Sequence, residues 1–129
     1  MTSGITREYH NIVDCSHKYT DVFKDDYVGP GNGAHHYLIE PKQTVGEPRK
    51  NTFVEIIFQD GPIGEAGVNG VMDENLIAIV IDRLRGFQKG PYVCRENAIA
   101  LTKLEESLMW LKERTAGRQA RGVEGTHKV

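Results

Sequence analysis

The spacing of apolar residues changes after Gly70, and this change limits the available folds more than any other feature of the chain. From there, apolar side chains recur with the period of an α-helix, at Ile77, Val80, Leu84 and Phe87. Additional apolar residues at positions 76, 79 and 81 indicate a helix buried on more than one side. Asp73 is predicted to cap its start. Gly90, in a left-handed conformation before Pro91, is predicted to end it.

A second helix is predicted from about Arg95 to about Arg118. Its leucines follow the 3-4-3 spacing of a coiled-coil seam, at Leu101, Leu104, Leu108 and Leu111. Because only a few residues separate the two helices, they are expected to fold back as an antiparallel hairpin. An isolated hairpin of this composition exposes apolar surface. We therefore expect it to cover a sheet, to pair with a second subunit, or both.

The chain before the helices is predicted to form strands and loops. Two segments rich in β-branched and aromatic residues, His35–Glu40 and Thr52–Gln59, are strand candidates, and Glu8–Ser16 is a weaker one. The glycine-rich segment Gly61–Gly70 is predicted to be loop. The sequence therefore predicts an α+β fold in a single domain, 1–129. About 1–70 would form a small antiparallel β-sheet with loops, and about 71–129 the hairpin and a tail that frays or crosses to a partner.

The pattern Phe-Gln-x-Gly-Pro occurs twice, at Phe58–Pro62 and at Phe87–Pro91. The apolar periods around the two copies differ, so we interpret them as one turn used twice rather than as an internal repeat. Phe58 is predicted to lie in the core, whereas Phe87 is a candidate for stacking on a ligand.

Composition and charge argue against several classes of protein. The net charge of −2 gives no reason to expect nucleic acid or an anionic membrane as a partner. The apolar stretch Leu76–Ile81 is too short to span a bilayer, and the start of the chain does not resemble a signal peptide. Two distant cysteines, Cys15 and Cys94, fit a reduced cytosolic protein. Residues 112–129 carry five Lys/Arg against two Glu, which suits a small anionic ligand or a solvated helix end.

The sequence carries no recognisable catalytic or metal-binding pattern. His35 and His36 are adjacent, so in a strand they would point to opposite faces, which is poor geometry for holding one metal ion. Neither HExxH nor a cysteine–histidine ligand spacing occurs. Cys94 is either a nucleophile or, as we favour, a small apolar residue at a helix start. We expect no enzyme, no cofactor and no metal.

Three residues offer the groups that a nucleotide ligand requires. Phe87 can stack on a base, Asn97 can hydrogen-bond to its edge, and Arg114 can bind a phosphate. Arg118 lies one turn beyond Arg114 on the same helix face and is a fourth candidate. For each residue alone, a structural role remains an alternative: an aromatic in the core, an amide in a first turn, a solvated arginine.

The spacing of these candidates predicts a homodimer. Phe87 and Asn97 flank the bend between the helices, whereas Arg114 lies 17 residues beyond Asn97. That separation is roughly 25 Å along a helix, too far for a mononucleotide-sized ligand to bridge. If the three share a site, Arg114 must come from a second subunit whose hairpin runs antiparallel, which gives two equivalent sites.

The segment 58–128 resembles the helical hairpin shared by phage anti-Thoeris and anti-CBASS sponge proteins. The resemblance is carried by the phrases GVNG, ENLIAIVIDRLRGFQKGP, CRENAIAL, LEESLMWLKERT and RGVEGTH. With the preceding β segment HHYLIE, the chain is similar to the first Thoeris anti-defence family. Members of that family have a small antiparallel sheet decorated by two long helices.

The resemblance implies a phage protein of the host bacterial cytoplasm that sequesters glycocyclic ADP-ribose isomers, the signals made by Thoeris TIR enzymes, without degrading them. It implies ligand contacts for Phe87, Asn97 and Arg114. Relatives form homodimers and in some cases trimers of dimers, some of which also hold cyclic di- or trinucleotides. The alternative is a phage structural or host-interaction protein that uses the hairpin to dock a partner chain.

Overall fold

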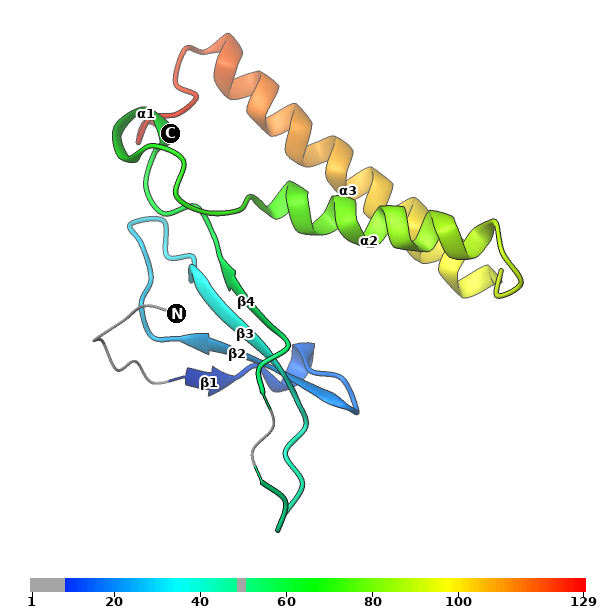
Figure 1. Ribbon diagram of the computed structural model, residues 1–129. Coiled ribbons are helices and arrows are strands. Elements are labelled where there is room, and N and C mark those ends of the chain that lie inside the picture. Colours follow the sequence, from blue (N-terminus) through cyan, green and yellow to red (C-terminus); the bar gives the residue numbers. More distant parts are fainter. Residues whose placement is uncertain (1–8, 49–50) are drawn as a thin grey trace. The chain divides into compact units, whose positions relative to one another are not determined.

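The computed structural model describes residues 9–48 and 51–129. The chain divides into two compact units, Met1–Asp60 and Gly61–Val129. The first unit holds a β-sheet and the second a helical hairpin (Figure 1). The predicted α+β fold, with strands in the N-terminal half and helices in the C-terminal half, is confirmed.

The sheet of the first unit has four antiparallel strands in the order β1-β2-β3-β4. Its strands are β1 (Tyr9–Asn11), β2 (Thr20–Asp25), β3 (His36–Pro41) and β4 (Val54–Ile57). The strand candidates at 35–40 and 52–59 correspond to β3 and β4. In the weaker candidate at 8–16, Glu8 lies outside the described residues, and β1 is followed by the 3-10 turn η1 (Val13–Cys15).

Strand β2 is missing from the sequence-based prediction because its buried positions are acidic. Asp21 and Asp25 are both buried. Both carboxylates are contacted from β3 or the residue after it: Lys42 Nζ lies 2.9 Å from Asp21 Oδ1, and His36 Nδ1 lies 3.5 Å from Asp25 Oδ2. The strand therefore lacks the apolar alternation that identifies its neighbours.

The two faces of the sheet differ in chemistry. Leu38 is buried on the face that also carries the buried His36 and Glu40, which lie two residues before and after it in β3. On the opposite face, Phe58 packs edge-on against Tyr37, with ring centroids 5.5 Å apart and planes at 87°. Phe58 is half-buried in this contact. The contact gives Phe58 a structural role, but the residue is not fully buried as the predicted core position requires.

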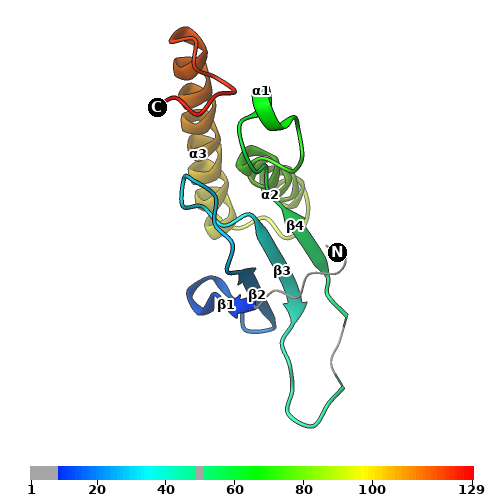
Figure 2. The same ribbon diagram turned by 90° about the vertical axis from the view of Figure 1, so that its left-hand side faces the viewer.

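The second unit contains α1 (Ile63–Ala66), α2 (Asp73–Gln88) and α3 (Arg95–Ala120). Helices α2 and α3 form the predicted antiparallel hairpin, which Figure 1 shows along its length and Figure 2 shows with α2 foreshortened. Helix α1 is a single turn within a segment predicted to be loop, so that prediction is wrong there. The turn forms because the carbonyl of Pro62 accepts from the backbone N–H groups of Glu65 and Ala66, at 3.0 and 2.8 Å.

Both predicted ends of the first hairpin helix need correction. The N-cap is Met72 rather than Asp73, and the backbone N–H of Met72 donates to Asn75 Oδ1 at 2.8 Å. Asp73 is the first helical residue, where an acidic side chain is favourable. At the other end, the C-cap Lys89 is right-handed and Gly90 is not in a left-handed conformation.

The two Phe-Gln-x-Gly-Pro copies therefore do not share one turn, because Gly61 in the first copy has φ of 86°. The first copy leads from a strand into α1 through this left-handed residue. The second copy begins in the last two residues of α2 and contains no left-handed residue. The same five-residue pattern thus adopts two backbone conformations, set by the elements that precede it.

The segment after α3 folds back within the second unit. Gly122, with φ of 71°, ends α3 in a Schellman motif: Gly122 N–H donates to Gln119 O at 3.0 Å, and Val123 N–H donates to Arg118 O at 3.0 Å. Farther on, the carbonyl of Gly125 accepts from Gly64 N–H at 3.0 Å. The tail therefore contacts α1, which the sequence did not predict.

Candidate functional site

The bend between α2 and α3 is closed by the side-chain amide of Gln88. Its Nε2 donates to Cys94 O at 3.2 Å, and its Oε1 accepts from Cys94 N–H at 3.2 Å. This pair of bonds fixes the connection from the last residue of α2 to the N-cap of α3. It places Phe87 and Asn97 on either side of the same bend, as predicted.

Cys94 acts as a helix cap. Its Sγ accepts from Asn97 N–H at 3.4 Å, and the residue is exposed. The interpretation of Cys94 as a small apolar residue is therefore incomplete, because the sulfur satisfies a backbone donor in the first turn of α3. The same bond orders the turn that carries Asn97.

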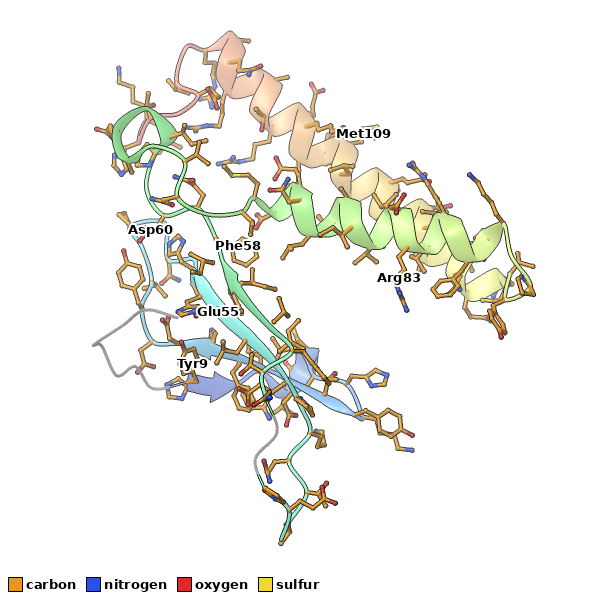
Figure 3. All side chains as sticks on the ribbon, viewed as in Figure 1. Tyr9, Glu55, Phe58, Asp60, Arg83 and Met109 are labelled. Atoms are coloured by element: carbon orange, nitrogen blue, oxygen red, sulfur yellow. The ribbon has the colours of Figure 1, made fainter. Side chains whose placement is uncertain are left out.

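Phe87 lies in the last turn of α2 and is half-buried. The guanidinium carbon of Arg83 lies 4.9 Å from the centroid of its ring (Figure 3). The sequence analysis missed this neighbour. The four-residue spacing of Arg83 and Phe87 on a helix is the signal that indicates it.

Arg114 is exposed on α3, and its side chain forms no hydrogen bond or ion pair with another residue of 9–48 or 51–129. Helix α3 is continuous from Arg95 to Ala120, so Asn97 and Arg114 belong to one uninterrupted helix. Their separation along it is roughly 25 Å. A single chain therefore brings Phe87 and Asn97 to the bend, but leaves Arg114 far along the helix.

Arg118 differs from Arg114 in having structural partners. Its Nη2 donates to Val123 O at 3.0 Å and to Thr126 O at 3.1 Å. The side chain is half-buried under the segment that follows α3. Arg118, the fourth ligand candidate, thus holds the segment after α3, residues 122–129, in place.

A groove of about 590 Å³ runs between α2 and α3. Apolar side chains of Ile81, Leu108 and Met109 line it. Arg85 and Glu105 cross it as an ion pair, with 2.7 Å between Nη2 and Oε2. None of the four candidate ligand residues lines this groove, so it is a feature of hairpin packing rather than of the predicted site.

In the sheet, one side chain from each strand meets at His36, which is 4% exposed. Glu55 of β4 pairs with Nε2, Tyr9 Oη of β1 lies 3.2 Å from Nδ1, and Asp25 of β2 lies 3.5 Å from Nδ1 (Figure 3). We call these four residues the His36 node. Among the described residues no His, Cys, Asp or Glu cluster is suited to a metal ion.

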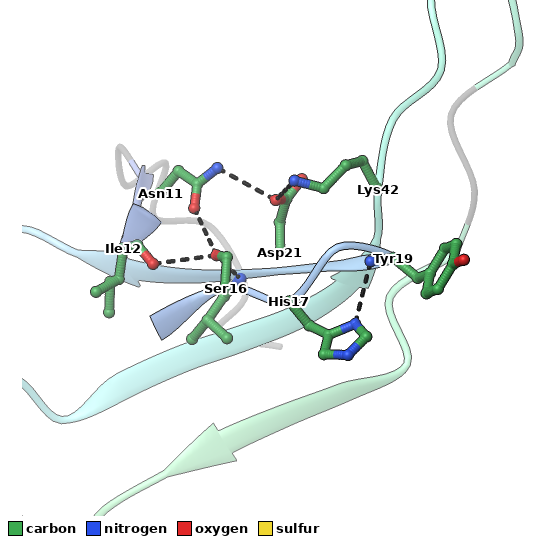
Figure 4. Close-up of polar contacts among 8 residues, drawn as sticks. Asn11, Ile12, Ser16, His17, Tyr19, Asp21 and Lys42 are labelled. Carbon is green, nitrogen blue, oxygen red and sulfur yellow. Dashed lines mark hydrogen bonds and ion pairs between the residues drawn. The ribbon is translucent and has the colours of Figure 1, made fainter. Parts of the chain in front are cut away.

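A second polar cluster of the sheet surrounds Asp21 (Figure 4). The hydrogen bond from Lys42 lowers the pKa of Asp21 below its ordinary value, against an opposing effect of burial, and Asn11 Nδ2 adds a bond at 3.3 Å. Ser16 Oγ donates to Asn11 Oδ1 at 2.9 Å and accepts from Val22 N–H at 3.0 Å. The cluster ties the η1 turn to β2.

Within residues 9–48 and 51–129, none of the helices has the length and apolar character needed to span a membrane.

The protein belongs to a class of small α+β proteins in which a four-stranded sheet is followed by an antiparallel helical hairpin. An aromatic residue and an amide lie at the bend of this hairpin, and an exposed arginine lies far from it. Residues 50–116 match the family model "Acb2/Tad1, hairpin domain", and the chain belongs to this family.

The likeness to a curated relative covers nearly the whole chain. Over 138 aligned residues the protein is 44% identical to Thoeris anti-defense 1 of Bacillus phage SBSphiJ7, covering 92% of this chain and 96% of the relative. The alignment therefore includes the sheet as well as the hairpin. The family resemblance drawn from the sequence is confirmed.

Proposed function

We propose that the protein binds and sequesters glycocyclic ADP-ribose isomers, the signals of Thoeris TIR enzymes, in the host bacterial cytoplasm without degrading them. The observation that carries this proposal is the 44% identity, over 92% of the chain, to a phage protein named Thoeris anti-defense 1. Phage anti-defence by signal capture requires a binding site and no turnover.

The proposed site combines the bend of one hairpin with α3 of another. Phe87 stacks on the base and Asn97 hydrogen-bonds to the ligand. Arg114 and Arg118 bind the diphosphate through charge-assisted bonds. The exposure of Arg114 and its lack of partners among the described residues support this role, because an arginine committed elsewhere would have to break bonds first.

The proposed site requires a homodimer, and two observations favour one. Asn97 and Arg114 are separated by a continuous helix, so an antiparallel partner supplies the arginine. The hairpin also exposes large apolar side chains, with Ile79 63%, Met109 57% and Trp110 63% exposed. Apolar surface of this kind on a soluble chain commonly marks an interface. We extend the proposal to a trimer of dimers, in which cyclic di- or trinucleotides bind at separate sites.

Calorimetry combined with ligand recovery tests the function. The protein is titrated with cyclic ADP-ribose isomers, cyclic dinucleotides and a short oligonucleotide, and the bound ligand is then released by denaturation and analysed by mass spectrometry. Binding of a glycocyclic isomer followed by recovery of the unchanged compound is expected. Recovery of a linear product would identify a hydrolase instead. Absence of heat with every ligand would favour the hairpin as a docking element for a phage or host protein.

A further inference from the structure

The tail, Gly122–Val129, is held by a small set of contacts within the second unit. Arg118 Nη2 donates to two of its carbonyls, those of Val123 and Thr126. Gly64 N–H donates to Gly125 O at 3.0 Å, and Glu65 Oε2 pairs with His127 Nδ1 at 2.7 Å. The tail therefore bridges α1 and the last turn of α3 through Arg118.

The bonds of Arg118 determine what else its guanidinium can bind. A guanidinium grips a phosphate bidentately along one of two edges, Nε with Nη2 or Nη1 with Nη2. Both edges include Nη2, and in this structure both tail carbonyls lie within hydrogen-bond distance of that atom. While the tail is docked, Arg118 has no complete edge to offer an anion.

We propose that the tail is an autoinhibitory contact, in which the carbonyls of Val123 and Thr126 compete with the ligand diphosphate for Arg118. Ligand binding releases the tail, and release of the tail strengthens ligand binding. This inference rests on the proposed function, because it assigns a competitor to one of the proposed phosphate-binding residues.

The remaining contacts of the tail are of the kind that opens readily. The Glu65–His127 pair is exposed, with side chains 64% and 61% accessible, and pairs of this type contribute little to stability. The other contact with α1 is the backbone bond between Gly64 and Gly125. At the end of the tail, Arg121 Nη1 donates to Val129 O at 2.7 Å in an exposed bond. Apart from the two bonds from Arg118, the tail is thus held by a few weak contacts. A charged ligand that binds Arg118 can therefore release the tail at a small cost in free energy.

Gly64 allows the tail to be undocked without altering Arg118. A Cβ at Gly64 would lie 2.9 Å from Gly125 O, a distance that forces the two segments apart. Gly64→Ala is therefore expected to increase the affinity for glycocyclic ADP-ribose roughly three- to tenfold, because the competing bonds are weakened in the free protein. Glu65→Gln should act in the same direction and more weakly. Gly31→Ala is the matched control, since its Cβ would meet nothing within 4 Å.

Hydrogen exchange in the full-length protein supplies the second measurement. Adding glycocyclic ADP-ribose to the wild type is expected to speed exchange of the Gly64 amide, because its bond to Gly125 O is lost when the tail leaves α1. Slower or unchanged exchange in the ligand-bound protein, or a Gly64→Ala variant that binds no more tightly than the Gly31→Ala control, overturns the competition. If neither wild type nor Gly64→Ala binds any isomer, the proposed function itself fails. Binding by Gly64→Ala alone would support strong autoinhibition.

Discussion

The guanidinium carbon of Arg83 lies 4.9 Å from the centroid of the Phe87 ring, one turn away in α2. A cation over one face of an aromatic ring occupies that face. In the proposed site, a ligand base would therefore stack on the opposite face or displace Arg83. Either way, Phe87 and Arg83 form a pair at the hairpin bend before any ligand binds. The contribution of Phe87 to ligand binding can therefore be compared with that of an exposed aromatic residue elsewhere in the chain.

Replacing Phe87 by alanine is expected to weaken binding of glycocyclic ADP-ribose by about 1–3 kcal/mol, the range measured for stacking of a base on an aromatic side chain. Calorimetry measures the loss directly. Phe53→Ala is the matched control, because Phe53 is a 66% exposed aromatic of the sheet unit. Equal affinity of the Phe87→Ala and Phe53→Ala variants would remove Phe87 from the site.

Mixing two variants with weakened binding tests whether Arg114 acts across subunits. Neither Phe87→Ala nor Arg114→Ala alone should bind tightly, because each homodimer lacks one partner in both sites. After unfolding and refolding together, heterodimers should regain one intact site, so about a quarter of the wild-type sites return in a random mixture. Calorimetric stoichiometry measures the recovery. A mixture without tight sites would place both residues in the same chain's site or in none.

A charge on the exposed apolar surface of the hairpin should disrupt the dimer. Met109→Lys introduces an ammonium group at a 57% exposed side chain beside the groove between α2 and α3. If this surface is the interface, burial of the charge shifts the protein toward the monomer. Sedimentation velocity reports the mass. Val45→Lys, at a fully exposed apolar residue of the sheet unit, should leave the mass unchanged. A Met109→Lys dimer as tight as the control would exclude this surface.

Removing the imidazole of the His36 node should destabilise the protein. His36→Ala leaves Glu55 and Asp25 without the imidazole that lies beside both carboxylates. Loss of one partner from a buried cluster of this kind lowers the free energy of unfolding by about 3 kcal/mol. Chemical denaturation followed by circular dichroism measures it. The exposed His10, which pairs with Asp26, is the control, and His10→Ala should cost less than about 1 kcal/mol.

The lowered pKa of Asp21 predicts a loss of stability in acid. The hydrogen bond from Lys42 favours the charged carboxylate in the folded state, so the unfolded chain takes up the proton first. The contribution is fully present above the ordinary pKa of 3.8 and is lost as the pH falls from there through the lower native value. Nuclear magnetic resonance titration of the Asp21 carboxyl should show the lowered pKa. Lys42→Met should raise it, and an unchanged titration would contradict the assigned cause.

The sequence was sufficient to predict the elements whose signals are local. The apolar period of α2 and α3 placed both helices within a few residues, and their short connection implied the antiparallel arrangement. Strand β2 was missed because Asp21 and Asp25 are buried against Lys42 and His36, which come from β3 and the residue that follows it. These contacts join residues far apart in the sequence, so the sequence of β2 itself shows no alternation of apolar and polar residues.

The candidate site shows the same division. Phe87 and Asn97 lie at the bend because helix lengths fix that position. The bonds that occupy Arg118 were not predicted, since they depend on the left-handed Gly122 turning the tail back on α3. Tail docking against Gly64 likewise joins residues about sixty positions apart.

Helix α3 also acts as a spacer. It contains 26 residues in one uninterrupted run, and an α-helix of that length extends about 39 Å. In an antiparallel dimer, each α3 would serve one site with its first turn and the other with its distal half, holding two ligands roughly 25 Å apart. Under the proposed function, such a dimer would take up one signal molecule per chain. The amount of signal that the protein can remove would then be set by the number of chains made in the cell, rather than by any rate constant.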